Sequence, residues 1–528
     1  MSNHAYESAA ALRPSSNGPI PISTLCERFS LAPASAEDAA ALNDLSILGV
    51  SVDSADTAPG ELFVGLPGFT VHGARFAAQA VASGAVAVLT DADGAQIVHQ
   101  TAPGTPTLVH SDPRAVVGPL SAEVYHHPAR GLVTTAVTGT NGKTTTAYFL
   151  DAILSAHVGG CMVAGTVELR VGERSVESPR TTVEAPVLQR MMALAVEDKV
   201  GAASLEASSH AIVLHRLDGI VVDVAGFTNL QRDHLDFHKT MEGYLEAKAQ
   251  LFTPEHARRG VVCVDDRWGA ALADEAPIEI DRVRAYPGDT PADWWVSDAA
   301  VSLTDSATTF TLHGPDGEKI EASCPLPGLV NVQNAALALV MAIRAGVPAA
   351  TAATALAGAH NIPGRMQRIS QRDGRRGLCI VDFAHTPDAM ELALKAVRPI
   401  TPGRLIVVFG SDGDRDQGKR PMLGEVCARL ADVLVVTDEN PRSEDPQLIR
   451  NAILEGVRGV RPDLTDVEEI TTWRGDAVRR GVELCGPDDT VIVTGKGHEP
   501  FLEMAGEFIR YNDAPVMAEA VEEKWGRA

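Results

Sequence analysis

The chain has 528 residues, 45% of them hydrophobic, and its 69 acidic and 45 basic side chains give a formal net charge of −24. A chain of this length is typically divided into about three domains. The acidic balance and the lack of a long basic cluster argue against a nucleic-acid partner and against stable association with an anionic membrane, so phosphate groups must be bound by a local site.

The first 20 residues are rich in Ser, Ala, Pro and Asn, and they predict a disordered lead over residues 1–20. They contain no apolar core of a signal peptide, and no apolar run in the chain reaches the roughly 18 residues of a membrane-spanning helix. The seven cysteines are scattered and none are paired at metal-ligand spacing, which is typical of reduced thiols. We expect a cytoplasmic protein that is monomeric.

The first domain is expected over residues 21–130. Its sequence predicts a strand at Leu62–Val64, a helix over residues 74–83 and a second strand over residues 85–89, the order of a small α/β unit. The Pro-containing stretch at residues 126–131 indicates a linker, which ends this domain.

The second domain, residues 131–362, is expected to open with a βα unit. A β-rich run over residues 132–137 is followed by a glycine loop and a helical pattern over residues 144–156. Backbone N–H groups at such a helix start cradle phosphates, Lys143 can reach the β- and γ-phosphates, and the Thr144 hydroxyl can bind Mg²⁺. The loop residues are Gly139, Thr140, Asn141, Gly142, Lys143, Thr144 and Thr145.

The phosphate-loop pattern departs from its general form at one position. The general form has a glycine where this chain has Val137, whereas the shorter pattern from Gly139 to Thr144 is complete. The alternative interpretation is a glycine-rich turn with a surface lysine.

A further candidate site surrounds the helix expected over residues 241–252. On a 3.6-residue period Lys248 falls within the apolar stripe of this helix, where a lysine is costly unless it is paired or chemically changed. The alternative is a lysine that extends from the edge of the core to solvent. Glu206, Asp233 and His234 supply carboxylate and imidazole groups suited to a Mg²⁺ site near the phosphate loop.

The third domain, residues 363–528, begins at the chain break Pro363-Gly364. Four apolar runs separated by helical patterns predict an open, doubly wound sheet, in which ligands bind outside the carboxyl ends of the strands. These runs cover residues 378–383, 405–409, 433–436 and 490–493, and each is followed by charged or glycine-rich sequence.

Taken in order, these motifs resemble the Mur ligase family, and within it the diaminopimelate-adding branch. The resemblance extends from about residue 48 to the end of the chain. It implies an α/β fold with three domains: one that binds the UDP moiety, a central P-loop ATPase domain, and a C-terminal Rossmann-like domain that binds the amino acid. It also rests on the following segments: Ser208 to His210, Thr228 to Asp236, Tyr244 to Lys248, Asn331 with Asn334, Gly364 to Met366, Asp382 with His385 to Pro387, Gly413 to Asp416, Asn440 to Arg442, and Gly495 to Glu499.

The resemblance assigns roles to individual residues. Lys248 is implied to be carbamylated (N6-carboxylysine) and, with Thr144, Glu206 and His234, to hold Mg²⁺, while Lys143 acts on ATP. The remaining nucleotide contacts are Asn331, Arg365 and Asp382. The contacts to UDP-MurNAc-L-Ala-D-Glu are Val52, Ser54 and the turn after Gly68 for the uridine end, and Thr181, Thr182, Ser208 and Arg216 for the muramoyl peptide. The contacts to meso-diaminopimelate are Arg415, Asn440, Pro441, Arg442, Gly495 and Glu499.

Arg442 is expected to set the choice of amino acid. Diaminopimelate carries a second carboxylate that L-lysine lacks, and a guanidinium group can pair with a carboxylate in two hydrogen bonds. Glu439, beside it in the chain, could pair with Arg442 and weaken this effect.

The chain departs from the family pattern at several positions. Ala55 replaces the arginine of an Asp-Ser-Arg segment, Arg180 stands where relatives often have asparagine, and Glu439 replaces the usual aspartate before Asn-Pro-Arg. The expected reaction is ATP-dependent amide formation through an acyl phosphate. The alternatives are an L-lysine-adding enzyme, another ligase of the same superfamily, and a P-loop NTPase that acts as a switch.

Overall fold

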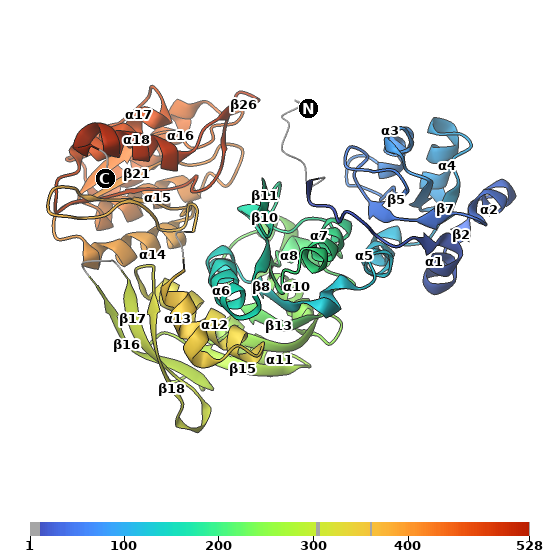
Figure 1. Ribbon diagram of the computed structural model, residues 1–528. Helices are drawn as coiled ribbons and strands as arrows, with labels where there is room; N and C mark the ends of the chain where they lie inside the picture. Colours follow the sequence, from blue (N-terminus) through green and yellow to red (C-terminus); the bar gives the residue numbers. More distant parts are fainter. Residues whose placement is uncertain (1–10, 303–306, 360–361, 527–528) are drawn as a thin grey trace. The chain divides into compact units, whose positions relative to one another are not determined.

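The computed structural model describes residues 11–302, 307–359 and 362–526 (Figure 1). The chain divides into two compact units. The first comprises Met1–Trp294 and Leu337–Ala355, and the second comprises Trp295–Ala336 and Leu356–Ala528. Helices α12 (Leu329–Arg344) and α13 (Ala349–Ala357) each have residues in both units.

The first unit begins with a sheet of strand order β2-β7-β6-β5-β4. Strands β4 to β7 are parallel, and β2 (Ala32–Pro33) is antiparallel to β7. Leu62 and Val64 belong to one apolar cluster and Phe63 to another, because successive side chains of a strand point to opposite faces of the sheet. The parallel strands are β4 (Gly49–Ser51), β5 (Glu61–Val64), β6 (Ala87–Thr90) and β7 (Thr107–Val109).

The helices of this region follow the strands in alternation, as the sequence predicts. The helix expected over residues 74–83 begins as a 3₁₀ turn, η2 (Gly73–Phe76), and continues as α3 (Ala77–Ser83). The other helices are α1 (Ile22–Phe29), α2 (Ala36–Leu42), α4 (Ala92–Thr101) and α5 (Pro113–Val124).

The expectation of a disordered lead over residues 1–20 is wrong for its second half, and residues 1–10 lie outside the described residues. Leu12 is fully buried in the apolar core of the second, larger sheet of this unit, which is described next. Arg13 pairs with Asp56 and Glu61, and the Ser15 hydroxyl donates to Glu197 at 2.6 Å. The polar composition of the segment hid these contacts, which depend on residues far away in the sequence.

The larger sheet of the first unit has the strand order β11-β10-β9-β12-β8-β13-β14-β15. Strands β10 and β11 are antiparallel additions to a parallel array. The strands are β8 (Val133–Thr138), β9 (Cys161–Ala164), β10 (Glu168–Val171), β11 (Arg174–Glu177), β12 (Ala202–Glu206), β13 (Val222–Phe227), β14 (Ala257–Cys263) and β15 (Glu279–Arg284). Its helices are α6 (Lys143–Val158), α7 (Ala185–Glu197), α8 (Ser209–Val213), α9 (Leu235–His238), α10 (Met241–Ala249) and α11 (Arg267–Glu275).

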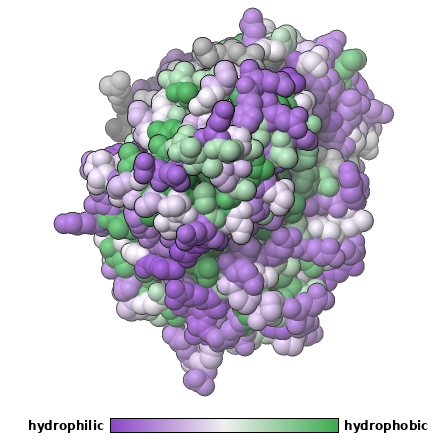
Figure 2. All heavy atoms as spheres, turned by 90° about the vertical axis from the view of Figure 1, so that its right-hand side faces the viewer, coloured by the Kyte–Doolittle hydropathy of each residue, from purple (hydrophilic) through white to green (hydrophobic). Residues whose placement is uncertain are grey.

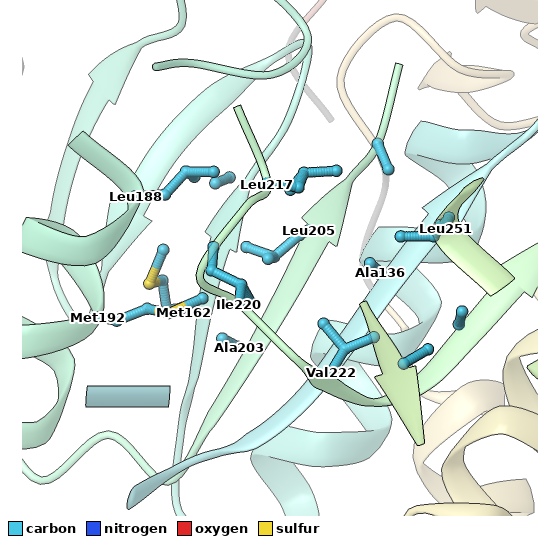
Figure 3. Packing of buried hydrophobic residues seen from close by; sticks show 14 of the residues in the cluster. Ala136, Met162, Leu188, Met192, Ala203, Leu205, Leu217, Ile220, Val222 and Leu251 are labelled. Carbon is cyan, nitrogen blue, oxygen red and sulfur yellow. The ribbon is translucent and has the colours of Figure 1, made fainter. Parts of the chain in front are cut away.

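The core of this region packs α7 against the parallel strands. Figure 3 shows Met192 of α7 beside Met162 of β9, with Ala203 and Leu205 of β12 in the same apolar cluster. Both strands are buried along their whole length: β9 is a continuous apolar run, whereas β12 includes the buried polar residues Ser204 and Glu206. The carboxyl ends of the parallel strands carry the phosphate loop and Glu206.

The second unit contains a sheet of strand order β19-β20-β24-β21-β22-β23. The four apolar runs of the sequence form β20 (Leu378–Val381), β21 (Leu405–Phe409), β22 (Val433–Val436) and β24 (Thr490–Val493). These strands and β23 (Val467–Glu469) are parallel, and β19 (Gln367–Ser370) is antiparallel. Its helices are α14 (Pro387–Val397), α15 (Lys419–Leu430), α16 (Pro446–Val460), α17 (Arg474–Leu484) and α18 (Asp513–Trp525).

Smaller antiparallel elements complete the chain. Strands β16 (Trp294–Val301), β17 (Thr308–His313) and β18 (Lys319–Cys324) pair in sequence, and β25 (Phe501–Met504) pairs with β26 (Glu507–Arg510). The three-domain α/β architecture is confirmed, whereas the boundaries at residues 130 and 362 remain predictions.

Hydrophilic and hydrophobic side chains are intermingled on the face that Figure 2 shows. Among the described helices, none combines the length and the apolar character needed to cross a membrane.

Candidate active site

The phosphate loop connects β8 to α6 at the carboxyl edge of the larger sheet. Gly139 and Gly142 have φ angles of 142° and 90°, which favour glycine. A Cβ atom at Gly139 would lie 1.8 Å from the Thr228 hydroxyl oxygen, so this position requires glycine for space as well. Val137 still belongs to β8, where it pairs with Glu206 and Gly226, and this explains why the shorter loop pattern is sufficient.

Residues after β13 hold the loop in place. The backbone N–H groups of Thr140 and Asn141 donate to Asn229, at 2.9 and 3.1 Å. The Thr228 hydroxyl donates to the Asn141 carbonyl at 2.6 Å. The loop is therefore fixed before any phosphate binds.

Two lysines converge on the loop. Lys143 Nζ donates to the carbonyl oxygens of Gly139 and Thr140, both at 2.9 Å, and Lys248 Nζ donates to the same Gly139 oxygen at 2.8 Å. Lys248 is only 1% exposed, so the alternative of a lysine extending to solvent is wrong. Burial, and then the charge of Lys143, hold the pKa of Lys248 well below its usual value.

Glu206 ends strand β12 and is 1% exposed. Its carboxylate accepts hydrogen bonds from the Thr144 hydroxyl at 3.0 Å, the Thr166 N–H at 2.8 Å and the Thr166 hydroxyl at 2.9 Å. Thr144 and Glu206 thus place two oxygen donors together at the start of α6. Oxygen donors are the ligands that Mg²⁺ prefers, so this pair fits the expected ion.

His234 lies farther from this pair. It begins the short helix α9 with a φ of 53°, and its ring is 5.0 Å from the His210 ring and 6.2 Å from the Tyr244 ring. The Tyr244 ring in turn lies 4.5 Å from Lys248 Nζ. The described residues contain no cluster of three or more His, Cys, Asp or Glu side chains that could hold a metal ion.

The residues expected to bind the muramoyl peptide are brought together beside Glu206. The Thr182 hydroxyl donates to the Glu206 carbonyl at 2.7 Å and accepts from the Ser208 N–H at 3.0 Å. The Thr181 hydroxyl is 3.1 Å from that of Thr166, and Arg216 Nη1 donates to the Thr182 carbonyl at 3.2 Å. Hydrogen bonds therefore connect the predicted substrate contacts to one another and to the predicted metal ligand Glu206.

The expected uridine segment follows β4. The Ser54 hydroxyl donates to Gln79 at 3.1 Å, and Val52 lies at the edge of an apolar cluster of the first sheet. Phe69, in the turn after Gly68, is 90% exposed. These residues belong to the first unit, like the phosphate loop.

The other expected nucleotide contacts belong to the second unit. The Asp382 carboxylate accepts from the N–H groups of Met366 at 2.8 Å and Ala384 at 2.9 Å. The Arg365 guanidinium lies 4.2 Å from the centre of the Phe383 ring, and the Asn331 side chain donates to the Pro327 carbonyl at 2.8 Å. Asp382, Arg365 and Asn331 belong to the second unit, and their contact with the nucleotide stays a prediction.

The expected amino-acid pocket lies at the carboxyl ends of β22 and β24. Asn440 donates to the Glu499 carboxylate at 3.1 Å. Lys496, which is fully buried, donates to Asn440 at 2.9 Å, to Glu499 at 3.1 Å and to the Phe501 carbonyl at 2.6 Å. The sequence motif contained Lys496, but nothing in the motif indicated that it holds the two predicted contacts together.

Arg442 follows Pro441 in a left-handed backbone conformation, with φ of 55°, and its side chain is 24% exposed. The carboxylates nearest its guanidinium are Glu503 at 3.6 Å and Asp412 at 3.9 Å, so the expected pairing with Glu439 is wrong. Both distances exceed hydrogen-bonding range, and Arg442 Nε is buried without a hydrogen-bond partner among the described residues. The hydrogen-bonding capacity of the guanidinium is therefore not saturated by the described residues.

Glu439 points elsewhere. It is 3% exposed, and a Cβ atom at Gly495, whose φ is 108°, would lie 2.5 Å from its Oε2. Burial, followed by the nearby carboxylate of Asp412, raises the pKa of Glu439 to about 8. Arg415, the remaining predicted contact, is exposed.

Three parts of the chain match domains of one enzyme family. Residues 137–342 match the Mur ligase middle domain, and residues 364–497 match the Mur ligase, glutamate ligase domain. Residues 46–123 match the Mur ligase family, catalytic domain.

Whole-chain relatives agree with these matches. A protein from Streptomyces coelicolor, named UDP-N-acetylmuramoyl-L-alanyl-D-glutamate–2,6-diaminopimelate ligase, is 43% identical over 91% of this chain and 93% of its own length. A protein from Leifsonia xyli subsp. xyli, named UDP-N-acetylmuramyl-tripeptide synthetase, is 42% identical over 95% of this chain and 96% of its own length. A solved structure of a UDP-N-acetylmuramoyl-L-alanyl-D-glutamate–2,6-diaminopimelate ligase has a TM-score of 0.64 and 31% identity, covering 92% of this chain and 96% of that one.

Proposed function

The chain belongs to the Mur ligase family, and we propose that it joins meso-diaminopimelate to UDP-N-acetylmuramoyl-L-alanyl-D-glutamate with conversion of ATP to ADP. One observation carries the proposal: a ligase named for this reaction is 43% identical over 91% of the chain. The family membership removes the alternative of a P-loop NTPase switch.

The first chemical step is phosphoryl transfer. An oxygen of the D-Glu side-chain carboxylate attacks the γ-phosphorus of ATP, the bond to the β-phosphate oxygen breaks, and ADP leaves. The N-terminus of α6, which begins at Lys143, and the ammonium of Lys143 would stabilise the charge that develops on the transferred group. The product of this step is an acyl phosphate.

The second step forms the amide. The neutral amino group of the incoming amino acid attacks the acyl carbon, the bond to the phosphate oxygen breaks, and inorganic phosphate leaves. Acyl phosphates hydrolyse, so the amino acid must be held in place and water excluded during this step. The pocket of Asn440, Arg442 and Glu499 supplies that binding.

The metal site that we propose consists of Thr144, Glu206, His234 and a carbamylated Lys248. Bound Mg²⁺ would neutralise the phosphate oxygens of ATP during transfer. The low pKa of Lys248 supports the modification, because a neutral amine is the form that adds CO₂. A carbamate keeps one N–H on Nζ, which would make the contact with the Gly139 carbonyl that the amine makes now.

The choice of amino acid rests on Arg442. No carboxylate of the described residues is within hydrogen-bonding distance of its guanidinium, which supports binding of the second carboxylate of meso-diaminopimelate, although Glu503 at 3.6 Å and Asp412 at 3.9 Å compete with it. L-lysine, the substrate of the alternative enzyme, has no second carboxylate to pair with Arg442. We further propose that the enzyme is a monomer of the cytoplasm, where nucleotide-linked substrates are made.

The test is a reconstituted reaction with purified protein. We expect ADP and phosphate release to require both the UDP substrate and the amino acid, with a tripeptide-linked nucleotide as product. Phosphate release that is independent of the amino acid would contradict the proposal.

A further inference from the structure

The turn between β9 and β10 holds the Glu206 carboxylate on two sides. The Thr166 N–H donates to Glu206 Oε1 at 2.8 Å, and the Thr166 hydroxyl oxygen is 2.9 Å from Glu206 Oε2. A Cβ atom at Gly165 would lie 2.2 Å from Oε1, so the turn can receive the carboxylate only because this residue is glycine. The backbone of the turn thus fixes one oxygen of Glu206, and a hydroxyl group contacts the other.

The Thr166 hydroxyl lies between the expected metal ligand and an expected substrate contact. Its oxygen is 2.9 Å from Glu206 Oε2 and 3.1 Å from the Thr181 hydroxyl oxygen. Glu206 is buried, whereas Thr166 and Thr181 are partly exposed. The three side chains therefore form a hydrogen-bonded chain that leads from the carboxylate to a hydroxyl that a ligand can reach. Thr166 belongs to none of the sequence motifs that predict the site.

Each hydroxyl group of this chain has a single proton to donate, whereas a carboxylate only accepts. The Thr166 proton is therefore directed to Glu206, the stronger acceptor, and the bond between the two hydroxyl groups uses the proton of Thr181. Glu206 Oε2 also accepts from the Thr144 hydroxyl at 3.0 Å. In this arrangement both lone pairs of Oε2 are occupied, and the Thr181 proton is already used.

We propose that Thr166 is a positioning residue that couples the cation site to the substrate site through the direction of its hydroxyl group. A cation held by Thr144 and Glu206 requires a lone pair of Oε2, the Glu206 oxygen beside Thr144. Thr166 releases that lone pair when its proton turns to Thr181, and Thr181 can then donate its own proton to the UDP-linked substrate. This inference rests on the proposed function, which assigns Mg²⁺ to Glu206 and the muramoyl peptide to Thr181.

The cation and the substrate consequently strengthen each other's binding. One hydrogen bond between neutral groups is gained at Thr181, so the coupling should amount to about two- to tenfold in affinity. Coupling of two binding equilibria is reciprocal, and it can therefore be measured through the substrate alone. The quantity to measure is the Mg²⁺ ratio, defined as Kd of the UDP substrate without Mg²⁺ divided by Kd with saturating Mg²⁺.

The test is calorimetric binding of the UDP substrate to the full chain, without ATP or amino acid. Thr166→Val keeps the size of the side chain and the N–H bond to Oε1, but it has no hydroxyl group to turn. Its Mg²⁺ ratio should be about two- to tenfold smaller than that of wild type. Mg²⁺ bound by the diphosphate of the substrate contributes equally to both proteins and cancels in this comparison. Thr166→Ser keeps the hydroxyl group and should keep the wild-type ratio.

Thr135→Val is the matched control. Thr135 is fully buried on β8, in the same sheet, and its hydroxyl donates to the Ala203 carbonyl at 3.3 Å. The substitution replaces a hydroxyl with a methyl group, as Thr166→Val does, and removes one hydrogen bond away from the chain of hydroxyls. It should leave the Mg²⁺ ratio unchanged, which separates coupling from a general loss of stability.

The cation site itself is checked with Mn²⁺ alone, titrated into each protein and followed by electron paramagnetic resonance. Thr166→Val should bind Mn²⁺ at least as tightly as wild type, because the hydroxyl group that occupies Oε2 is gone. Loss of Mn²⁺ binding in the folded variant would overturn the proposal, since Thr166 would then only maintain the shape of the cation site.

A second variant interrupts the same chain from its other end. Thr181→Val cannot donate to the substrate, so its Mg²⁺ ratio should fall as that of Thr166→Val does, and it serves as the test if Thr166→Val does not fold. An Mg²⁺ ratio equal to that of wild type in either folded variant would overturn the coupling, even if wild type forms the expected product. Absence of that product in wild type would overturn the proposed function instead.

Discussion

Lys248 combines an apolar position in helix α10 with a contact to the phosphate loop, where it shares the Gly139 carbonyl with Lys143. The helical period places it in an apolar stripe, but leaves open whether its ammonium is buried or extends to solvent. The distance to Gly139 could not be predicted, since the two residues are 109 positions apart. The helical pattern thus predicts the position of a single residue on its helix, but not its contacts with residues distant in the sequence.

We predict that Lys248 of the active enzyme carries a carbamate. Supply of ¹³C-bicarbonate should give a carbamate signal that is absent from Lys248→Ala, because the neutral amine favoured by burial adds CO₂. Lys248→Ala should lose activity, bicarbonate should not restore it, and short carboxylic acids should restore part of it. An active wild-type enzyme whose Lys248 remains an unmodified amine would contradict this assignment.

We predict that Lys143→Ala lowers kcat on the order of 10²-fold or more, because the ammonium that stabilises the transferred phosphoryl group is lost. Lys143 lies at the start of α6, where its side chain donates to the carbonyl oxygens of Gly139 and Thr140, so thermal unfolding should change little. A folded variant with near wild-type turnover would remove Lys143 from the mechanism. Turnover and melting temperature, measured on the same preparation, decide the question.

Glu439 gives a prediction for stability against pH. Its pKa is raised to about 8 by burial and Asp412, above the ordinary value of 4.5, so the folded protein binds its proton more tightly than the unfolded chain does. The stability that the protonated group contributes is fully present below about pH 4.5 and is lost as the pH rises through about 8. Glu439→Gln, which cannot ionise, should therefore gain in melting temperature relative to wild type between pH 5 and pH 9, by about 2–4 °C for each kcal/mol. A pH-independent difference would show that Glu439 ionises normally in the folded protein.

At the scale of elements, the parallel strands could be predicted because they are buried on both faces. Val433–Val436 and Thr490–Val493 are found at the residues expected, since continuous apolar runs between helical patterns leave little freedom in their assignment. Residues 11–18 could not be predicted, because their order depends on single ion pairs and one buried leucine rather than on a periodic pattern. Arg442 is a similar case: its neighbour Asp412 follows β21 and its neighbour Glu503 lies in β25, so they come from distant parts of the sequence.

We predict that Arg13, in the N-terminal segment, supports both the stability of the protein and the binding of the UDP substrate. Arg13 contacts Asp56 and the buried Glu61, and Asp56 closes the turn that follows the expected uridine contact Ser54. Arg13→Ala should lower the free energy of unfolding by about 1–3 kcal/mol, because a buried carboxylate loses its partner. It should also raise KM for the UDP substrate more than KM for ATP, because the uridine turn loses a support.

Ser15→Ala is the control for this variant. The Ser15 hydroxyl contacts Glu197, at an exposed position away from the uridine turn. Its loss should change neither KM. Equal KM values for Arg13→Ala and wild type would restrict residues 11–18 to a purely structural role.

At the scale of the whole molecule, the expected nucleotide contacts are divided between the two units. The phosphate loop belongs to the first, whereas Asn331, Arg365 and Asp382 belong to the second. Sequence motifs could identify these residues as candidate nucleotide contacts, because the family resemblance orders them along the chain, and that role stays a prediction. They could not predict the unit to which each belongs, since helices α12 and α13 each contribute to both.

The central claim is that this chain is a ligase for meso-diaminopimelate, and the most direct measurement compares meso-diaminopimelate with L-lysine for wild type and Arg442→Ala. Wild type should form product with meso-diaminopimelate at a kcat/KM far above that for L-lysine. In Arg442→Ala, KM for meso-diaminopimelate should rise by the equivalent of roughly 2–5 kcal/mol, with KM for ATP and the UDP substrate nearly unchanged. Because Asp412 and Glu503 already lie near the guanidinium, we expect the lower part of that range. Equal use of both amino acids by wild type, or an unchanged preference in Arg442→Ala, would contradict the account.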